Sequence, residues 1–376
     1  MSTPAVIREY TPQDREGVLA LFQRHFGSWS SERWARRWQW QYHDPRGCSD
    51  CRSFIQVAES DGAIVGHLGA FPLPLRINAD RFDALCAEGF VVERDHRWAA
   101  FSLLKNLASK GGIVFGTSWS RAASKLFQFY GAMALPLSEV RYVYQLRHRG
   151  ATCRELRRRL PPLLHWMANR WSSAMVTPLL DRRWGRRSKP LPRLDQAGDL
   201  RPISRFGEEY DELWRSAAGQ FEVSLDKNAA YMNWRYLDCP TMSPIRLGCY
   251  DGHDRLAGAI VACRRAHRDV RRRPCGEDGE IVELIVREPE SPIVERLVVP
   301  VMERLDRHGV DAVAATGLHP RLHPLLEGIG FERTACGWGT LRAISNIRDR
   351  SAGDILQDEL WYFTSGDGDH LFGQGI

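Results

Sequence analysis

Short apolar runs separated by polar turns occur in the first half of the chain, and a similar series of runs occurs in the second half. The runs at 54–58 and 63–71 flank Asp61-Gly62, and the runs at 245–250 and 256–263 flank Asp251-Gly252. Asp-Gly between apolar runs predicts a β-hairpin, because the turn needs a positive φ that glycine adopts without strain. Each part of the chain therefore begins its sheet with antiparallel strands.

An internal repeat with a constant offset explains this recurrence. The motif Trp-Gln-Tyr-His-Asp-Pro at 40–45 is echoed by Trp-Arg-Tyr-Leu-Asp-Cys-Pro at 234–240, so that Trp234 follows Trp40 by 194 positions. Two later β-rich runs end at Val92 and Val286, which are also 194 positions apart. A shared offset at two separated landmarks indicates two copies of one structural unit.

The elements that follow the hairpin also have a common order in the two copies. They are a β-rich run (85–92; 281–286), a helix (99–109; 293–308), a strand (113–115; 312–315), a short helix ending at Gly131 or Gly330, and a closing strand (140–146; 340–344). Strands first and then alternating β and α elements predict an α/β (α+β) fold, in which a mixed sheet carries helices on its faces.

A basic amphipathic segment separates the copies. Apolar residues between 160 and 179 recur near a period of about 3.6, with arginines at the other positions. From Arg147 to Lys189 the chain carries twelve Arg or Lys residues and two acids. The basic face of such a helical connector is either solvated or in contact with an anionic membrane surface or polyanion. We expect an N-terminal domain at 1–148, the connector at 149–195 and a C-terminal domain at 196–376.

The composition is that of an ordinary globular protein. Hydrophobic residues make up 43% of the 376 residues and charged residues 26%, which excludes a disordered chain. The net charge of +6 comes from the connector, because the rest of the chain is acidic. The cysteines are odd in number and scattered, and Cys48 and Cys51 lack the second pair of ligands of a zinc site. No signal segment or membrane-spanning run is visible, so we expect a cytoplasmic protein without a metal.

The order of elements, with a V-x-x-x-x-R element from Val92 to Arg97, resembles the GNAT acyltransferase superfamily over nearly all of both copies. The Trp-x-Tyr motifs and the tail Trp-Tyr-Phe-Thr-Ser-Gly-Asp-Gly-Asp at 361–369 are similar to tandem GNAT proteins of bacterial exopolysaccharide pathways. The resemblance implies two tandem GNAT-like mixed β-sheets flanked by helices. It also implies that an acyl-CoA, with acetyl-CoA as the first candidate, is the acyl donor.

In such proteins the acyl-CoA lies where one strand splays from its neighbour, and its pyrophosphate sits at the N-terminus of the next helix, where backbone N–H groups favour an anion. The matching loop here is 97–102. Ala100 stands in place of a glycine, and its methyl group fits only if the backbone does not need a positive φ. Thr117, Ser118 and Ser120 could contact the cofactor or cap the following helix. The candidate cofactor-binding residues are Phe90, Val91, Val92, Arg97, Trp98, Ala99, Ala100, Phe101, Ser102, Thr117, Ser118 and Ser120.

The second copy departs further from the resemblance. Its loop reads Arg-Glu-Pro-Glu-Ser-Pro at 287–292, and the two acids would repel a pyrophosphate while the prolines remove backbone donors. We expect this domain to have lost cofactor binding and to serve as a structural partner or as a wall of the acceptor site.

Direct acyl transfer needs a base to deprotonate the acceptor and an acid to protonate the departing thiolate. By resemblance Glu88 is the candidate base. Its alternative role is a structural carboxylate paired with an arginine. His67 and His96 are weaker candidates, because a single histidine is more often structural.

The acid of the superfamily is a tyrosine four residues before the glycine that ends the last helix. This chain has Phe127 at that position and Leu326 in the second copy, and neither can donate a proton. Tyr130 substitutes only if its hydroxyl faces the sulfur, and is otherwise a packed aromatic residue. Without it, the thiolate leaves through water.

The sequence therefore predicts an acyltransferase that moves an acyl group to an amine or hydroxyl of a small acceptor, such as a saccharide of an exopolysaccharide precursor. Trp34, Trp38 and Trp40 either stack on a sugar or pack in the core. Two other functions stay open. One is a Fem-like aminoacyl transferase that uses aminoacyl-tRNA, although nucleic acid is the less favoured partner, and the other is a non-catalytic binding module.

Overall fold

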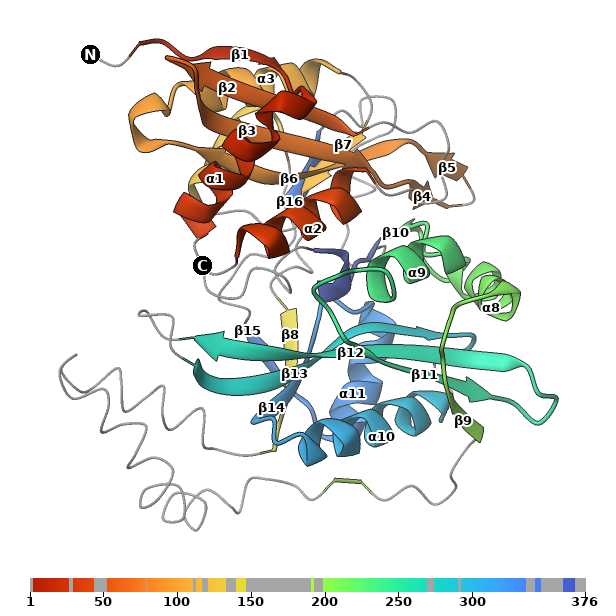
Figure 1. Ribbon diagram of the computed structural model, residues 1–376. Helices are drawn as coiled ribbons and strands as arrows, with labels where there is room; N and C mark the ends of the chain where they lie inside the picture. The colour runs from red at the N-terminus through yellow and green to blue at the C-terminus, as the bar shows by residue number, and fades with distance from the viewer. Residues whose placement is uncertain are drawn as a thin grey trace.

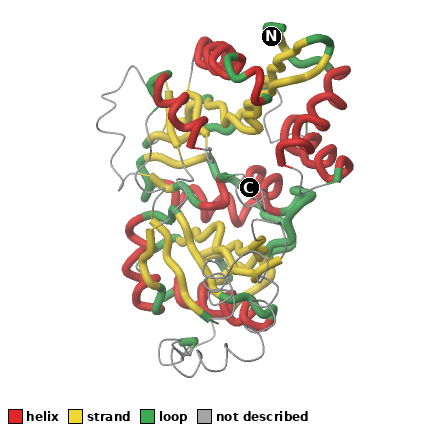
Figure 2. Tube along the Cα trace, turned by 90° about the vertical axis from the view of Figure 1, so that its left-hand side faces the viewer, coloured by secondary structure: helices red, strands yellow, loops and turns green. Residues whose placement is uncertain are grey.

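A computed structural model shows two lobes, each a mixed sheet with helices on its faces, stacked one above the other (Figures 1 and 2). It describes residues 3–26, 30–43, 53–78, 80–110, 113–116, 121–132, 140–146, 191–192, 199–268, 274–289, 292–335, 342–345 and 361–368. Thr117, Ser118, Ser120, the CxxC motif and almost all of the predicted connector at 149–195 lie outside the described residues.

The upper lobe of Figure 1 holds a six-stranded sheet of order β1-β2-β3-β6-β7-β16. Its strands are β1 Val6–Glu9, β2 Phe54–Ser60, β3 Ala63–Pro72, β6 Ala84–Val92, β7 Ile113–Gly116 and β16 Arg342–Ser345. The helices α1 Arg15–Phe26 and α2 Ser31–Tyr42 pack on one face, and α3 Ala99–Ser109 and α4 Arg121–Phe129 pack on the other. α3 lies on the sheet because its Leu103, Leu104 and Leu107 recur at helical spacing and are buried.

The lower lobe holds a seven-stranded sheet of order β15-β8-β14-β13-β12-β11-β9. Its strands are β15 Glu332–Ala335, β8 Val140–Gln145, β14 Ala312–Thr316, β13 Pro274–Val286, β12 Leu256–Arg268, β11 Ile245–Tyr250 and β9 Asp199–Pro202. Its helices are α8 Glu208–Ala218, α9 Ala229–Tyr236, α10 Ile293–Arg307 and α11 His323–Ile329. The predicted α/β architecture of two tandem mixed sheets flanked by helices is confirmed.

The two sheets exchange their closing strands. β8 comes from the first copy, yet it pairs with β14 and β15 in the second sheet, with Val143 opposite both Ala314 and Glu332. β16 comes from the second copy and pairs with β7 in the first sheet, with Arg342 opposite Gly116. Sheet membership thus departs from the ranges 1–148 and 196–376 at these two strands. A sheet edge accepts any strand that satisfies its backbone hydrogen bonds, and sequence pattern does not select between two similar edges.

A small four-stranded sheet of order β17-β10-β4-β5 joins the lobes. Its strands are β4 Leu75–Ile77, β5 Asp80–Phe82, β10 Val223–Leu225 and β17 Trp361–Tyr362. β10 pairs in parallel with β17 and antiparallel with β4, so each copy and the tail contribute to it. These strands have only two or three residues each, too few to show an alternating pattern in the sequence.

Trp40 and Trp234, the landmarks of the repeat, contact each other where the copies meet. Their rings stack with centroids 4.6 Å apart and planes 10° apart. Trp40 Nε1 donates to the Trp234 carbonyl at 2.8 Å, and Trp234 Nε1 donates to the Trp40 carbonyl at 3.2 Å. A residue meets its own counterpart reciprocally only at a two-fold axis, so the copies are related by pseudo-two-fold symmetry here.

The three tryptophans clustered in α2 lie in the core. Trp34, Trp38 and Trp40 are 8%, 2% and 2% exposed, and Trp38 packs against Tyr42 with ring centroids 4.6 Å apart. Of the two interpretations, the structure supports core packing, because side chains this buried offer no face on which a sugar could stack.

The two hairpin turns differ. Asp61 and Gly62 have φ values of 50° and 74°, as the Asp-Gly signal predicts for the first copy. In the second copy the predicted hairpin also forms, because β11 and β12 pair antiparallel, but Asp254 at φ 58° takes the left-handed position expected at Gly252. The Asp251 carboxylate accepts hydrogen bonds from the backbone N–H groups of His253 and Arg255, at 2.8 and 3.1 Å, which stabilises a longer turn.

We predict that Trp40→Phe and Trp234→Phe each lower the free energy of unfolding by about 1–3 kcal/mol, because each leaves a buried carbonyl without its donor. The double variant should lose less than the sum of the two, since both changes remove parts of one contact. Denaturant unfolding measures all three. Trp98→Phe is the matched control: Trp98 is 81% exposed, and we expect a change within about 0.5 kcal/mol. Strictly additive losses would show that the pair is not coupled.

Candidate functional site

The candidate site begins where β6 and β7 part. These parallel strands pair only at Ala84–Ile113, Leu85–Val114 and Cys86–Phe115. Among the described residues, no strand pairs with 87–92 on the β7 side of β6. A strand edge opened in this way offers backbone donors and acceptors to an extended ligand. The gap leads directly to the N-terminus of α3, since β6 ends at Val92 and α3 begins at Ala99.

A β-bulge shapes β6 beside this gap. His67 lies opposite Val91 and Gly69 lies opposite Glu88, so β6 has one extra residue in this interval. Gly89 adopts φ +66°, and an added Cβ would lie only 3.1–3.2 Å from Phe22, His67 and Tyr42. Glycine is therefore required here by both conformation and space.

His67 holds the bulge from the neighbouring strand. Its Nδ1 lies 2.6 Å from the Gly89 carbonyl oxygen, to which it can only donate. The ring is fully buried among Phe22, Trp38 and Tyr42, with centroids 5.0, 5.3 and 6.1 Å away. Burial lowers the pKa of His67 to about 4, so the ring is neutral at physiological pH. This geometry makes His67 a positioning residue for the bulge.

Glu88 lies on β6 immediately before the bulge and faces α2. Its side chain is buried, and its Oε2 accepts a hydrogen bond from Gln41 Nε2 at 2.6 Å. Arg37 Nη2 lies 3.5 Å from the same oxygen, and Arg37 Nε donates to Gln41 Oε1 at 3.1 Å. Arg37 and Gln41 are four residues apart and therefore share one face of α2. The carboxylate that the sequence singled out is thus oriented by two donors on one helix.

The predicted loop at 97–102 forms the first turn of α3 and the two residues before it. Arg97 and Trp98 have right-handed helical backbone angles, and Trp98 provides no side-chain cap. Ala100 lies within the helix and does not have a positive φ. Its methyl group therefore fits at this position, where the superfamily has a glycine, without conformational strain. A helix N-terminus without a side-chain cap is a site where an anion can satisfy backbone N–H groups. His96 lies just before it, in the 3₁₀ turn Arg94–His96.

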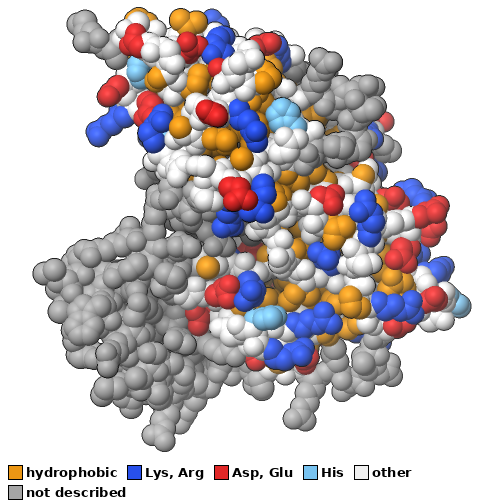
Figure 3. Space-filling model, viewed as in Figure 1, with side chains coloured by type: hydrophobic (Ala, Val, Ile, Leu, Met, Phe, Trp, Pro, Cys, Tyr) orange, Lys and Arg blue, Asp and Glu red, His pale blue; other side chains and the backbone are white. Residues whose placement is uncertain are grey.

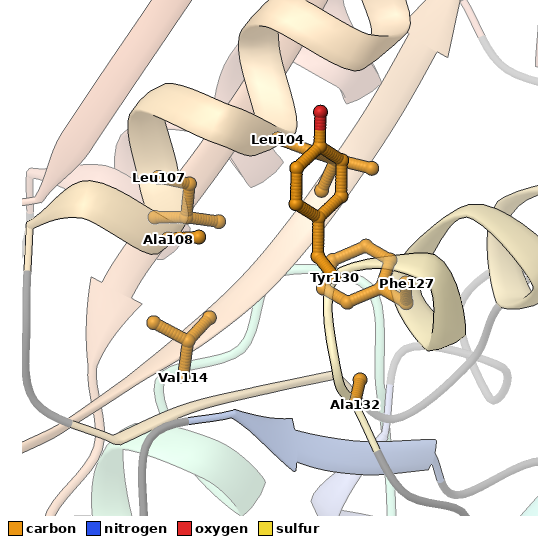
Figure 4. A pocket seen from close by; sticks show the side chains of 7 residues that line it. All are labelled: Leu104, Leu107, Ala108, Val114, Phe127, Tyr130 and Ala132. Carbon is orange, nitrogen blue, oxygen red and sulfur yellow. The ribbon is translucent and has the colours of Figure 1, made fainter.

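Tyr130 lies on the opposite face of the sheet from Glu88. Its hydroxyl donates to the Phe101 carbonyl at 3.0 Å, tying the end of α4 to the first turn of α3. Phe127 and Tyr130 line a hollow of about 10 Å³, and the Tyr130 hydroxyl points away from Val114 and Ala132 (Figure 4). Glu88 and Tyr130 therefore cannot exchange a proton directly, and only a ligand that passes between β6 and β7 can meet both.

The second copy has the same gap, but the chain's own tail fills it. β13 and β14 pair only at Gly279–Val313, Glu280–Ala314 and Ile281–Ala315. Beyond this point the Tyr362 hydroxyl lies 2.7 Å from the Leu284 carbonyl oxygen and 3.4 Å from the Leu284 nitrogen. The tail, the dark blue segment between the lobes in Figure 1, thus takes the backbone groups that a ligand would need.

A buried ionic cluster fixes the tail in this position. Lys227 Nζ lies 2.7 Å from Glu283 Oε1 and 2.8 Å from Asp367 Oδ2, and all three side chains are at most 1% exposed. The Tyr236 hydroxyl donates to Glu283 at 2.9 Å, and the Tyr231 hydroxyl donates to Asp367 at 2.8 Å. Burial, and then the charge of Asp367, raises the pKa of Glu283. Removal of one partner from such a cluster would leave an uncompensated buried charge.

Sequence reasoning missed several residues of this arrangement. Arg37 and Gln41 could have been suspected from their spacing on an amphipathic helix, and Gly89 from its place inside a strand, where glycine often marks a bulge. Nothing in the sequence indicated that Tyr362 would lie in the second gap. Among the described residues, no group of three or more His, Cys, Asp or Glu side chains could hold a metal, and no helix is both long and apolar enough to cross a membrane.

The fold is shared with acyltransferases of known structure. N-myristoyltransferase from Saccharomyces cerevisiae, solved with bound myristoyl-CoA and inhibitors, aligns with a TM-score of 0.57 at 10% identity over 92% of this chain and 80% of that chain. A probable N-acyltransferase from Enterococcus faecalis gives 0.56 at 10% identity over 91% and 72%. A GCN5-related N-acetyltransferase from Anabaena variabilis gives 0.55 at 12% identity over 90% and 72%.

No protein-family profile matches the sequence, and no curated protein matches it. At these identities the structural matches show the fold, which is the GNAT-type fold that the resemblance implied.

We predict that the free energy of unfolding decreases as the pH is lowered from ~6.5 to ~4, and that His67 causes part of this decrease. Its folded-state pKa of about 4 is below the unfolded value, so unfolding takes up a proton in this range. The resulting contribution, up to about 3 kcal/mol, is present above pH ~6.5 and lost as the pH falls toward 4. Denaturant unfolding of the wild type and of His67→Gln over this range measures it. The variant should show a flatter pH dependence, and parallel curves would exclude the assignment.

We predict that Gly366→Ala displaces the tail from the second gap. An added Cβ would contact the Tyr236 hydroxyl and lie 2.6 Å from the Val282 carbonyl oxygen. Limited proteolysis should cut the tail faster in the variant, and the free energy of unfolding should fall by about 1–3 kcal/mol. Gly219→Ala is the control, because nothing lies within 4 Å of its added Cβ. Equal proteolysis of both variants would show that the tail is not held at Gly366.

Proposed function

We propose that this protein is an acyl-CoA-dependent acyltransferase with a single cofactor site in the first copy. The observation that carries the proposal is the contrast between the two gaps. Strand pairing ends after three residue pairs in each, but among the described residues the tail occupies only the second gap. The shared fold with N-acetyl- and N-myristoyltransferases supports the class of reaction.

In this proposal the pantetheine arm lies along 87–92 of β6, beside Phe90, Val91 and Val92. The pyrophosphate binds at the start of α3, where Arg97 supplies a positive charge and the N–H group of Ala99 is the first helical donor. The Ala100 and Phe101 N–H groups donate to the Arg97 and Trp98 carbonyls at 3.1 and 3.2 Å. Thr117, Ser118 and Ser120 remain proposed contacts at the end of β7. Acetyl-CoA is the proposed donor.

The proposed chemistry is direct transfer. The acceptor nitrogen or oxygen attacks the thioester carbonyl carbon and gives its proton to Glu88, and the carbon–sulfur bond breaks to release the CoA thiolate. Gln41 and Arg37 orient Glu88 for this step from the α2 face. The thiolate gains a proton from Tyr130 if its hydroxyl leaves the Phe101 carbonyl, and otherwise from water.

We propose that the acceptor is a small molecule with an amine or hydroxyl, such as a saccharide of an exopolysaccharide precursor, and that the reaction takes place in the cytoplasm. The tail motif at 361–369, which carries the resemblance to exopolysaccharide proteins, supports this acceptor class. The second copy would form the other wall of the acceptor site, because Trp234 and the tail meet the first copy at its α2 side.

We predict that acetyl-CoA binds the wild type and that Arg97→Glu weakens this binding at least about tenfold, because the change repels the pyrophosphate. Isothermal titration calorimetry at low and moderate salt measures both proteins. Arg307→Glu, the same change of charge on an exposed arginine of α10, is the control and should bind like the wild type.

Glu88→Gln separates binding from chemistry. It should bind acetyl-CoA normally and lower turnover of any acceptor found in a saccharide and amine screen by about 10²- to 10⁴-fold. If neither the wild type nor the variants bind acetyl-CoA, the proposal fails, and aminoacyl-tRNA becomes the next donor to test. Acyl-CoA binding without turnover of any acceptor would favour a binding module.

A further inference from the structure

A row of exposed aromatic rings crosses the outer side of α3 and α4. Trp98, Phe101 and Phe129 are 81%, 38% and 73% exposed, and we call these three residues the aromatic row. Trp98 stacks on Phe101 with ring centroids 5.6 Å apart, and Phe101 meets Phe129 edge-on at 6.2 Å. Among the described large hydrophobic residues, only Val6 on β1 is similarly exposed outside this row.

The protein holds these rings in the solvent rather than folding them inward. The inner faces of both helices are filled, since Leu103, Leu107 and Phe127 are buried against the sheet. Tyr130 contacts two residues of the row. Its hydroxyl donates a hydrogen bond to the Phe101 carbonyl, and its ring centroid lies 5.3 Å from that of Phe129. Contiguous exposed aromatic rings are costly to hydrate and mark a surface that is covered in use.

The charges on the two helices that carry the aromatic row are all positive. The stretch 97–130, which includes both helices, contains five Lys or Arg residues and no Asp or Glu. Lys105 lies one helical turn after Phe101, Lys125 lies one turn before Phe129, and both lysines are exposed. The two acids just before this stretch are Glu93, which is paired with Arg24 and His25, and Asp95. By contrast, both signs of charge are interspersed on the face in Figure 3.

We propose that the aromatic row, with Lys105 and Lys125 beside it, docks the protein on an anionic membrane surface. Tryptophan and phenylalanine rings enter the headgroup boundary, while lysine side chains reach the lipid phosphates beside them. The row spans two helices, which is more than the single adenine ring of a CoA molecule would cover. The proposal involves no residue of the connector, and such docking would place the reaction beside the membrane.

The proposal goes beyond the acyltransferase function and assigns the side chains of Trp98 and Phe101 to the membrane. The charge of Arg97 and the N–H group of Ala99 at the start of the same turn remain for the pyrophosphate. Binding to vesicles and binding of acetyl-CoA are therefore separate measurements, and either can succeed when the other fails.

The test is co-sedimentation of the full-length protein with vesicles of phosphatidylcholine alone and of equal parts phosphatidylglycerol and phosphatidylcholine. The test variant is Lys125→Glu with Phe129→Ser, since neither residue belongs to the proposed cofactor site. The matched control is Arg307→Glu with Val6→Ser, which makes the same kinds of change at exposed positions elsewhere. Circular dichroism and acetyl-CoA titration confirm that each variant is folded.

We expect the wild type and the control to bind the anionic vesicles, with weaker binding at higher salt, and the test variant to bind at least about tenfold more weakly. Wild-type binding to neither kind of vesicle, or equal binding to both, would overturn the proposal. So would full binding by the test variant, which would assign any membrane contact to the connector. A variant that loses acetyl-CoA binding while it still binds vesicles would place the row in the cofactor site.

Discussion

The reciprocal contact of Trp40 and Trp234 is the constraint on which the rest of the arrangement depends. Each indole donates to the backbone carbonyl of the other tryptophan across a pseudo-two-fold axis. This reciprocal contact fixes the distance and the angle between α2, which carries Trp40, and α9, which carries Trp234. The exchanged strands β8 and β16 and the small sheet of order β17-β10-β4-β5 link the same two copies. A stack of two indoles at 4.6 Å combines a large buried apolar area with two directional hydrogen bonds, which few other side-chain pairs can do.

The symmetry of the copies makes their differences informative. In each copy the two parallel strands, β6 with β7 and β13 with β14, pair at only three positions. Beyond these positions both copies have an unpaired strand edge along which an extended ligand could lie. In the second copy the Tyr362 hydroxyl takes the Leu284 backbone groups, and a buried cluster of Lys227, Glu283 and Asp367 fixes the tail. A cluster this buried is costly to assemble and more costly to break, so the second gap stays closed.

The open gap is shaped by two residues whose roles are geometric. Gly89 gives β6 the bulge that changes the direction of the strand after Glu88, and neutral His67 holds the Gly89 carbonyl. Gln41 and Arg37 then orient Glu88 from the opposite helix. Glu88 therefore faces the α2 side of the sheet, and in the proposed reaction the acceptor would reach it from that side. The cofactor would have to enter from the α3 side, where the aromatic row and the first turn of α3 lie.

The sequence by itself determined the elements and the repeat, because these depend on local periodicity and turn chemistry. The strands at 54–60, 63–72 and 84–92 and the helix at 99–109 follow from patterns within single windows of the chain. The offset of Trp40 and Trp234 identified two copies, and the GNAT-type fold followed from their order. Glu88 and the loop from Arg97 were singled out by the resemblance to the GNAT superfamily, and their roles stay predictions.

Only the tertiary structure decided how these parts are combined. The exchange of β8 and β16 was invisible in the sequence, because either sheet edge satisfies the same backbone groups. Gln41, which donates to Glu88, is 47 residues away from it in the chain, and Tyr362 of the tail is 78 residues away from Leu284. Hydropathy describes which positions are buried but not which buried groups meet. The opposite placement of Glu88 and Tyr130, the filling of the second gap and the aromatic row at the surface therefore depend on packing between distant segments.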